Sequence, residues 1–282
     1  MSAATKKSAE DLMNAVESFP SLPHAVLDII RSLDDESLKL EQLARKIESD
    51  LGMLAGVLKL VNSPRYGAKG SVVSTQQAVM ILGFNAVRNL ACLGGVSSHF
   101  QNNCRDLFDF KKFMRHSIGV ACCAKFIARR TRLNPDAAFV SGLLHDVGQL
   151  VTAVTLSEEL REVMDYKRRH DCHVALAERA VLGIDHAQIG AHLASRWNFP
   201  LVIGEAIGSH HQVFEVGGSR MADVVHVAEV LSHALDFGGS GQVPPLCHDA
   251  MIRLGLSFQD MRMHFDEIEE ECCDFVQMLG VD

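Results

Sequence analysis

NPDAAFVSGLLHDVGQL, residues 134–150, is the stretch of sequence that decides how this chain folds. Pro135 is favourable at the first position of a helix, and almost every residue after it is apolar, so the stretch predicts a buried helix that ends at Gly148. His145 and Asp146 stand near the end of that helix. Burying a carboxylate beside an imidazole is unfavourable unless a cation or hydrogen-bond donors compensate. The pair is therefore the first candidate for chemistry.

Helical patterns continue on both sides of this stretch, while alternating strand patterns are nearly absent. The fold class that the sequence predicts is all-α, a compact assembly of mostly short helices rather than a long bundle. The expected helical segments are 24–33, 37–50, 52–61, 75–83, 85–99, 107–130, 135–148, 150–170, 185–197, 200–211, 221–237 and 246–279. Polar residues 101–104 mark a seam between subdomains, and Gly238–Pro245 read as a flexible link.

Composition limits the classes of function. The chain has 282 residues, of which 48% are hydrophobic, and a net charge of −8. The negative charge disfavours binding to nucleic acids and anionic membranes. The N-terminus lacks the apolar core of a signal peptide, and we find no uncharged apolar window of about 18 residues, so we expect no membrane span. Eight cysteines without a C-x-x-C motif are typical of free thiols in the cytoplasm, where we expect the protein.

Histidine is over-represented, with 14 in the chain and seven between His145 and His211. Histidine is the commonest metal ligand, and a mixture of its nitrogen with carboxylate oxygen suits iron, manganese or zinc. The candidate ligands that the sequence offers are His116, His145, Asp146, His186, His210, His211 and Glu229. The remaining histidines, His233 among them, are interpreted as surface or packing residues.

The order of these residues, together with RHSIGVA at 115–121, GLLHDVGQL, IGSHH at 207–211 and VVHVAEVLSHAL at 224–235, resembles the HD superfamily of metal-dependent phosphohydrolases. The N-terminal part, with LP at 22–23, KLVNSPRYG at 59–67 and AVMILGFNAVRNL at 78–90, is similar to the HDOD family, the HD-related output domain. The resemblance covers roughly residues 16–237. It implies an all-helical bacterial signalling module with an N-terminal helical subdomain, residues 1–105, an HD-like core, 106–237, and a linker with C-terminal helices, 238–282.

The resemblance also implies roles for the candidate residues. His116, His145, Asp146, His186, His210 and His211 fall on positions that bind a pair of divalent metal ions in HD enzymes, and Glu229 stands at the place of a late aspartate. In an active enzyme Asp146 and His145 would be the catalytic pair, holding metals that activate water against a phosphoester.

Three departures from the HD pattern bear on activity. The lysine of the family's HDxGK motif is Gln149 here, and the Gly-Tyr-Pro motif of the cyclic-di-GMP phosphodiesterases is missing after His211. The position four before His116, which is a metal-binding Glu in some of those enzymes, is Lys112. Cleavage of cyclic-di-GMP is therefore disfavoured.

Three functions stay open at this point. The first is a signalling protein that acts through contacts with protein partners and retains an HD-type metal pocket. The second is an active metal-dependent phosphohydrolase on a nucleotide or another phosphoester. The third and weakest is a DNA-binding regulator, because the basic residues of the segment 37–61 alternate with acidic ones and form no one-sided basic face.

Overall fold

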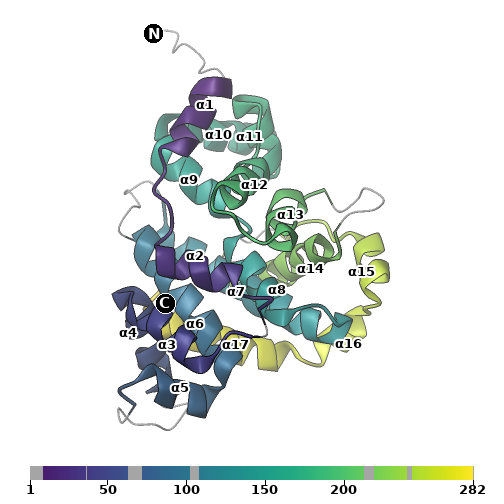
Figure 1. Ribbon diagram of the computed structural model, residues 1–282. Coiled ribbons are helices and arrows are strands. Elements are labelled where there is room, and N and C mark those ends of the chain that lie inside the picture. Colours follow the sequence, from purple (N-terminus) through teal and green to yellow (C-terminus); the bar gives the residue numbers. More distant parts are fainter. Residues whose placement is uncertain are drawn as a thin grey trace.

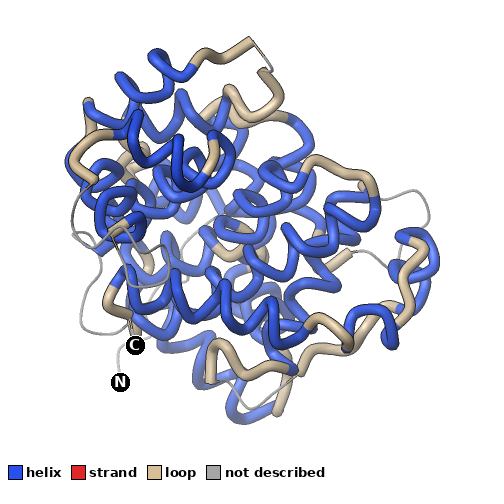
Figure 2. The backbone as a smooth tube through the Cα atoms, turned by 90° about the horizontal axis from the view of Figure 1, so that it is seen from below, coloured by secondary structure: helices blue, strands red, loops and turns tan. Residues whose placement is uncertain are grey.

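The computed structural model describes residues 9–35, 37–62, 72–101, 108–212, 219–239 and 243–281. All regular secondary structure in these ranges is helical, and Figure 2 shows helices joined by short loops with no strand among the residues it describes. The all-α fold class predicted from the sequence is confirmed. Residues 102–104 of the predicted seam and residues 240–242 of the predicted link lie outside the described residues.

A group of helices from the N-terminal third packs at one end of the molecule (Figure 1). Its members are α2 (His24–Arg31), α3 (Leu40–Glu48), α4 (Leu51–Val61), α5 (Thr75–Leu82) and α6 (Phe84–Gln101). Helices α4 and α6 approach closely because Gly56 and Gly94 face each other. A Cβ on Gly94 would come within 2.9 Å of the backbone of α4. The last helix of the chain, α17 (Phe265–Leu279), packs against α4 and so returns the C-terminus to this group.

The middle of the molecule is built around the long helix α7 (Phe110–Thr131). The helices α8 (Pro135–Leu144) and α14 (Arg220–Ala234) pack along it, and α13 (Leu201–Ser209) packs on both of these. Gly142 of α8 lies against the backbone of Ala121 in α7, where a Cβ would come within 2.9 Å of backbone atoms. This close approach places the end of α8 beside α7, and with it the His145-Asp146 pair.

Four further helices form the other end of the molecule (Figure 1): α9 (Val147–Thr155), α10 (Ser157–His170), α11 (Val174–Leu182) and α12 (His186–Arg196). The first helix, α1 (Ala9–Glu17), packs against α9 rather than joining the other N-terminal helices. Its Leu12 belongs to a small separate core with Leu156 and Val163. The division of the chain at residues 105 and 237 stays a prediction. Near the C-terminus, α15 (His248–Leu254) packs on α14 and precedes the short α16 (Phe258–Arg262).

Polar contacts tie the N-terminal group to the rest. Arg88 of α6 donates to Asp136 of α8 at 2.6 Å, and Asn89 donates to the other carboxylate oxygen of Asp136 at 2.8 Å. All three side chains are buried. Arg31 of α2 donates to the carbonyl oxygen of Trp197, at the end of α12, at 2.7 Å. The N-terminal group is therefore tied both to the central helix α8 and to α12 at the other end of the molecule.

The predicted helix from Pro135 to Gly148 is wrong in one respect, since α8 ends at Leu144 and a new helix begins at Val147. The imidazole of His145 explains the break. Its Nδ1 donates to the carbonyl oxygen of Gly142 at 2.8 Å, and that carbonyl would accept the amide of Asp146 in a continuous helix. The predicted segment 150–170 is likewise divided, at Leu156, and α11 has no counterpart among the predicted helices.

One segment, residues 135–155, is long and apolar enough by composition to cross a membrane, whereas we expected no such segment from the sequence. In the fold it comprises α8 and α9, and 89% of the apolar window is buried among other helices. Its hydropathy is that of a core segment.

Candidate metal centre

The carboxylate of Asp146 lies at the junction of α8 and α9 and is surrounded by imidazole rings. Its Oδ1 is 3.1 Å from His186 Nε2 and 3.8 Å from His210 Nε2. Its Oδ2 is 3.4 Å from His145 Nε2 and 3.9 Å from His116 Nε2. One oxygen thus faces the rings from α12 and α13, and the other faces those from α7 and α8.

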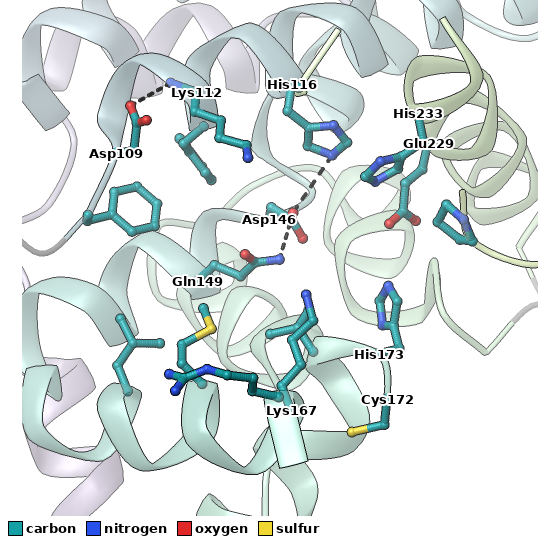
Figure 3. Close-up of a pocket in the computed structure, with 18 of the residues that line it drawn as sticks. Asp109, Lys112, His116, Asp146, Gln149, Lys167, Cys172, His173, Glu229 and His233 are labelled. Atoms are coloured by element: carbon teal, nitrogen blue, oxygen red, sulfur yellow. Dashed lines mark hydrogen bonds and ion pairs between the residues drawn. The ribbon is translucent and has the colours of Figure 1, made fainter. Parts of the chain in front are cut away.

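The seven residues predicted from the sequence all fall into groups whose potential ligand atoms lie within 4.8 Å of one another. One group is Asp146, His186, His210 and His211; a second is His116, His145 and Asp146; a third is His116, Glu229 and His233. Asp146 belongs to two groups, as a carboxylate that bridges two cations would. Figure 3 shows Asp146, His116, Glu229 and His233 pointing into one cavity.

Two of the histidines are oriented by the same device at the end of a helix. His145 follows α8 and donates from Nδ1 to Gly142, and His210 follows α13 and its Nδ1 lies 2.8 Å from the carbonyl oxygen of Ile207. A carbonyl oxygen only accepts, so Nδ1 carries a proton in each ring, and Nε2 of the neutral form has a lone pair for a cation. Neutral imidazole with a free Nε2 is the form that binds metal.

His186 is positioned by a carboxylate that the sequence analysis did not single out. Its Nδ1 lies 2.6 Å from Glu178 Oε2, and its backbone amide donates to the same oxygen at 2.8 Å. Glu178 is 1% exposed and comes from α11. A carboxylate behind a ligating histidine fixes the ring and raises its basicity, which is the usual arrangement around protein-bound zinc and iron. His186 itself is the first residue of α12, inside the Asp185–Gln188 capping box predicted from the sequence.

The pKa values divide the rings into two kinds. Burial lowers the pKa of His210 and His211 well below the usual range and that of His116 to about 3, so these rings are neutral. Burial also opposes protonation of His186 and His145, but nearby carboxylates outweigh it and raise both pKa values: Glu178 and Asp146 for His186, and Asp146 and Glu229 for His145. Burial raises the pKa of Glu229 to about 7. A protonated His186 therefore supplies the positive charge between two buried carboxylates.

The structure offers a direct test of whether a cation fits. Four atoms at this site are buried and have no hydrogen-bond partner among the described residues: His145 Nε2, Asp146 Oδ1, His210 Nε2 and Glu229 Oε2. Buried polar atoms are nearly always paired, because each unpaired one costs about 1–3 kcal/mol. When the rings are neutral and the carboxylates ionised all four are acceptors, and all belong to residues of the metal-compatible groups. Two nitrogens and two oxygens without donors fit divalent cations.

A cavity of about 770 Å³ opens above this site. Asp146, His116, Glu229 and His233 line its base, and Lys112 and Lys167 line it from α7 and α10. Phe113 and Leu160 contribute to an apolar wall. Gln149, which the sequence comparison placed at the family's lysine position, donates to Asp146 Oδ2 at 2.7 Å (Figure 3). The site is thus accessible to a small molecule with anionic and apolar parts.

The profile of the HDOD domain matches residues 19–213. The chain belongs to the HDOD family. The resemblance stated from the sequence motifs is confirmed, and the HDOD match includes His116, His145, Asp146, His186, His210 and His211 but ends before Glu229 and His233.

Solved structures agree on the fold. An HDOD domain protein of unknown function from Geobacter sulfurreducens is 26% identical, with a TM-score of 0.82 over 96% of both chains. A proposed phosphohydrolase from Shewanella amazonensis SB2B is 22% identical, with a TM-score of 0.76 over 95% of this chain and 97% of that one. A proposed signal transduction protein from Marinobacter aquaeolei VT8 is 24% identical, with a TM-score of 0.75 over 97% of this chain and 65% of that one. The latter two support the fold alone.

A curated relative from Treponema pallidum (strain Nichols), an uncharacterized protein, is 26% identical over 212 residues. The match takes in 74% of this chain but 40% of that protein, so this chain corresponds to part of a longer relative.

Proposed function

We propose that this HDOD protein binds a pair of divalent cations in the pocket around Asp146 and, with them, a phosphorylated ligand, as part of a bacterial signalling pathway. The observation that carries the proposal is the set of four buried acceptors without donors, on His145, Asp146, His210 and Glu229. A protein pays this cost when something else completes the site. Iron, manganese and zinc suit the nitrogen and oxygen donors.

The protein's own residues would divide the work. Asp146 would bridge the two cation positions, with His186, His210 and His211 on one side and His116, His145 and Glu229 on the other. Glu178 would hold the His186 ring and Gln149 the Asp146 carboxylate, through the contacts described above. When bound, the cations would supply positive charge to phosphoryl oxygens and lower the pKa of a bound water.

The phosphate preference is supported by two lysines on the cavity wall. Lys112 and Lys167 come from helices on different sides of the cavity, and Figure 3 shows both side chains extending into it. Lys112 Nζ donates to the carbonyl oxygen of Gly239 at 3.0 Å and keeps two further N–H groups. The HD pattern has a cationic lysine where this chain has the neutral Gln149. Lys112 and Lys167 would supply the cationic contact instead.

Hydrolysis of the ligand is the second candidate function. It is favoured by the position of Asp146, whose two oxygens face separate ligand groups, because two adjacent cations can stabilise both the attacking and the leaving oxygen of a phosphoester. In that case Asp146 and His145 are the catalytic residues. In either case we expect the state of the pocket to be read by protein partners in the cytoplasm. DNA binding is not favoured, given the net charge of −8.

Elemental analysis of the purified protein, with and without added Mn²⁺, Fe²⁺ or Zn²⁺, tests the metal proposal. We expect about two cations per chain in the wild type and a clear loss in Asp146→Asn. Fewer than about 0.1 per chain after metal loading would contradict the proposal. Calorimetry with inorganic phosphate then tests the ligand class, with Lys112→Met and Lys167→Met expected to weaken binding and leave the metal content unchanged.

A panel of phosphoesters separates signalling from catalysis. It would contain a nucleoside monophosphate, a cyclic dinucleotide and a short RNA. Turnover that is lost in Asp146→Asn supports hydrolysis. Binding without turnover supports a sensor, and turnover that survives the substitution would show that this site is not catalytic.

A further inference from the structure

His233 is interpreted from the sequence as a surface or packing residue, not as a metal ligand. It follows Glu229 by four residues on α14, so the two side chains leave the same face of the helix, about one turn apart. Both line the cavity, and both belong with His116 to a group of potential ligand atoms within 4.8 Å of one another. The rings of His116 and His233 are 4.6 Å apart, centroid to centroid.

His116 connects this group to the group around Asp146. The hydroxyl of Ser232 lies 3.5 Å from His116 Nδ1, and His116 Nε2 faces Asp146 Oδ2 at 3.9 Å. His116 therefore turns Nε2 towards Asp146 and lies in one group with Glu229 and His233. Because this ring is common to both groups, we infer that they surround one position.

We propose that His233 is an additional nitrogen ligand of one cation position. His116, His145, Asp146 and Glu229 surround that position. This rests on the proposed metal pair and adds a residue to it. In the HD pattern an aspartate stands where this chain has Glu229, and the longer side chain changes how a carboxylate approaches the cation. A histidine one turn further along the same helix supplies a second donor from the same direction.

The environment of His233 supports a ligand role. Burial lowers its pKa to about 4, so the ring is neutral near pH 7 and has a lone pair to donate. Figure 3 shows the His233 imidazole beside the His116 imidazole and the Glu229 carboxylate. The His233 ring points towards the cavity and away from the helix core.

The test is cobalt binding to the full chain, because Co²⁺ replaces zinc-like ions and its visible absorption reports the number and type of ligands. We compare wild type, His233→Ala and His192→Ala. His192 is a partly exposed histidine of α12 that pairs with Glu17 at 3.7 Å and does not line the cavity. Melting temperatures without metal check that all three proteins are folded.

The wild type and His192→Ala should bind two Co²⁺ with the same spectrum. His233→Ala should bind one with unchanged affinity and the other at least about tenfold more weakly, since even residues behind the ligands change affinity by about 10–100-fold. The absorption of the weakened site should change because a nitrogen ligand is lost.

Three results would overturn the inference. Two cations bound by His233→Ala with wild-type affinity and spectrum would show that His233 is no ligand, and leave the proposed metal pair intact. Three cations in the wild type would show a separate third position. No cation in the wild type would end both this inference and the proposed function.

Discussion

The Nε2 atoms of His186 and His211, which belong to one group with Asp146, lie 2.9 Å apart. Two lone pairs at that distance would repel, so one nitrogen must carry a proton when no cation is between them. The proton belongs to His186, because Glu178 and Asp146 raise its pKa while burial lowers that of His211. A cation that binds both nitrogens must displace this proton.

Metal affinity should therefore rise with pH. The pKa of His186 is raised well above 6.5, so its proton is present at neutral pH and competes more strongly as the pH falls. Zn²⁺ or Mn²⁺ should bind more weakly at pH 6 than at pH 8, with proton release. Calorimetry in two buffers of different ionisation enthalpy measures that release. Affinity that is flat over this range would contradict the proton assignment.

Glu178→Gln should weaken metal binding by about 10–100-fold without removing a ligand. The substitution keeps the shape and a hydrogen bond to His186 but removes the charge that makes the ring basic. It should also reduce the proton release described above. Competition with a chelator measures the affinity. Glu162→Gln, at an exposed position of α10, is the control that should bind like the wild type.

Gly148→Ala should destabilise the protein and disturb the site together. A Cβ on Gly148 would overlap the carbonyl oxygen of His186, so α9 and α12 would have to move apart. We expect a loss of at least about 1–3 kcal/mol of unfolding free energy, measured by chemical denaturation. Gly204→Ala is the matched control. Its new Cβ would lie 3.6 Å from Ala194, and it should be neutral or stabilising by up to about 1 kcal/mol. Equal effects would contradict the close packing.

Arg88→Met should cost about 3–5 kcal/mol of stability, because it leaves the carboxylate of Asp136 buried without its cation. Adding Asp136→Asn should restore much of the loss, since the amide is neutral and can still accept from Asn89. Arg168→Met removes the cation of an exposed pair with Asp165 and should change stability by about 0–1 kcal/mol. A double variant no better than Arg88→Met would show that packing, not charge, dominates.

The sequence predicted most of the helices because their signals are local. Pro135 starts α8, Asp185 and Gln188 cap α12, and Gly83 ends α5, each through contacts within a few residues. The break after Leu144 was missed because its cause is a side chain. His145 takes a backbone acceptor from its own helix, and an apolar run such as FVSGLL gives no sign of that.

The site residues could be predicted where their order along the chain matches the family pattern, and the others could not. The seven candidate ligands were found from their order along the chain, and the structure brings them into shared groups. Glu178 and His233 were missed because their roles depend on which helix faces which. Glu178 sits on a helix that had not been predicted, and His233 resembled any other histidine on an apolar helix. Whether cations occupy the groups stays a prediction.

The order of these residues has a consequence for how the protein folds. The candidate ligands come from α7, the junction between α8 and α9, α12, the end of α13 and α14. The contact between His116 on α7 and His233 on α14 therefore closes a long loop of chain. Such distant pairings form late, after local helices. The cation positions can exist only when the whole central body has assembled. A chain that unfolds locally at either edge of that body would release its ions before it melts, so ion retention would report on the integrity of the native state.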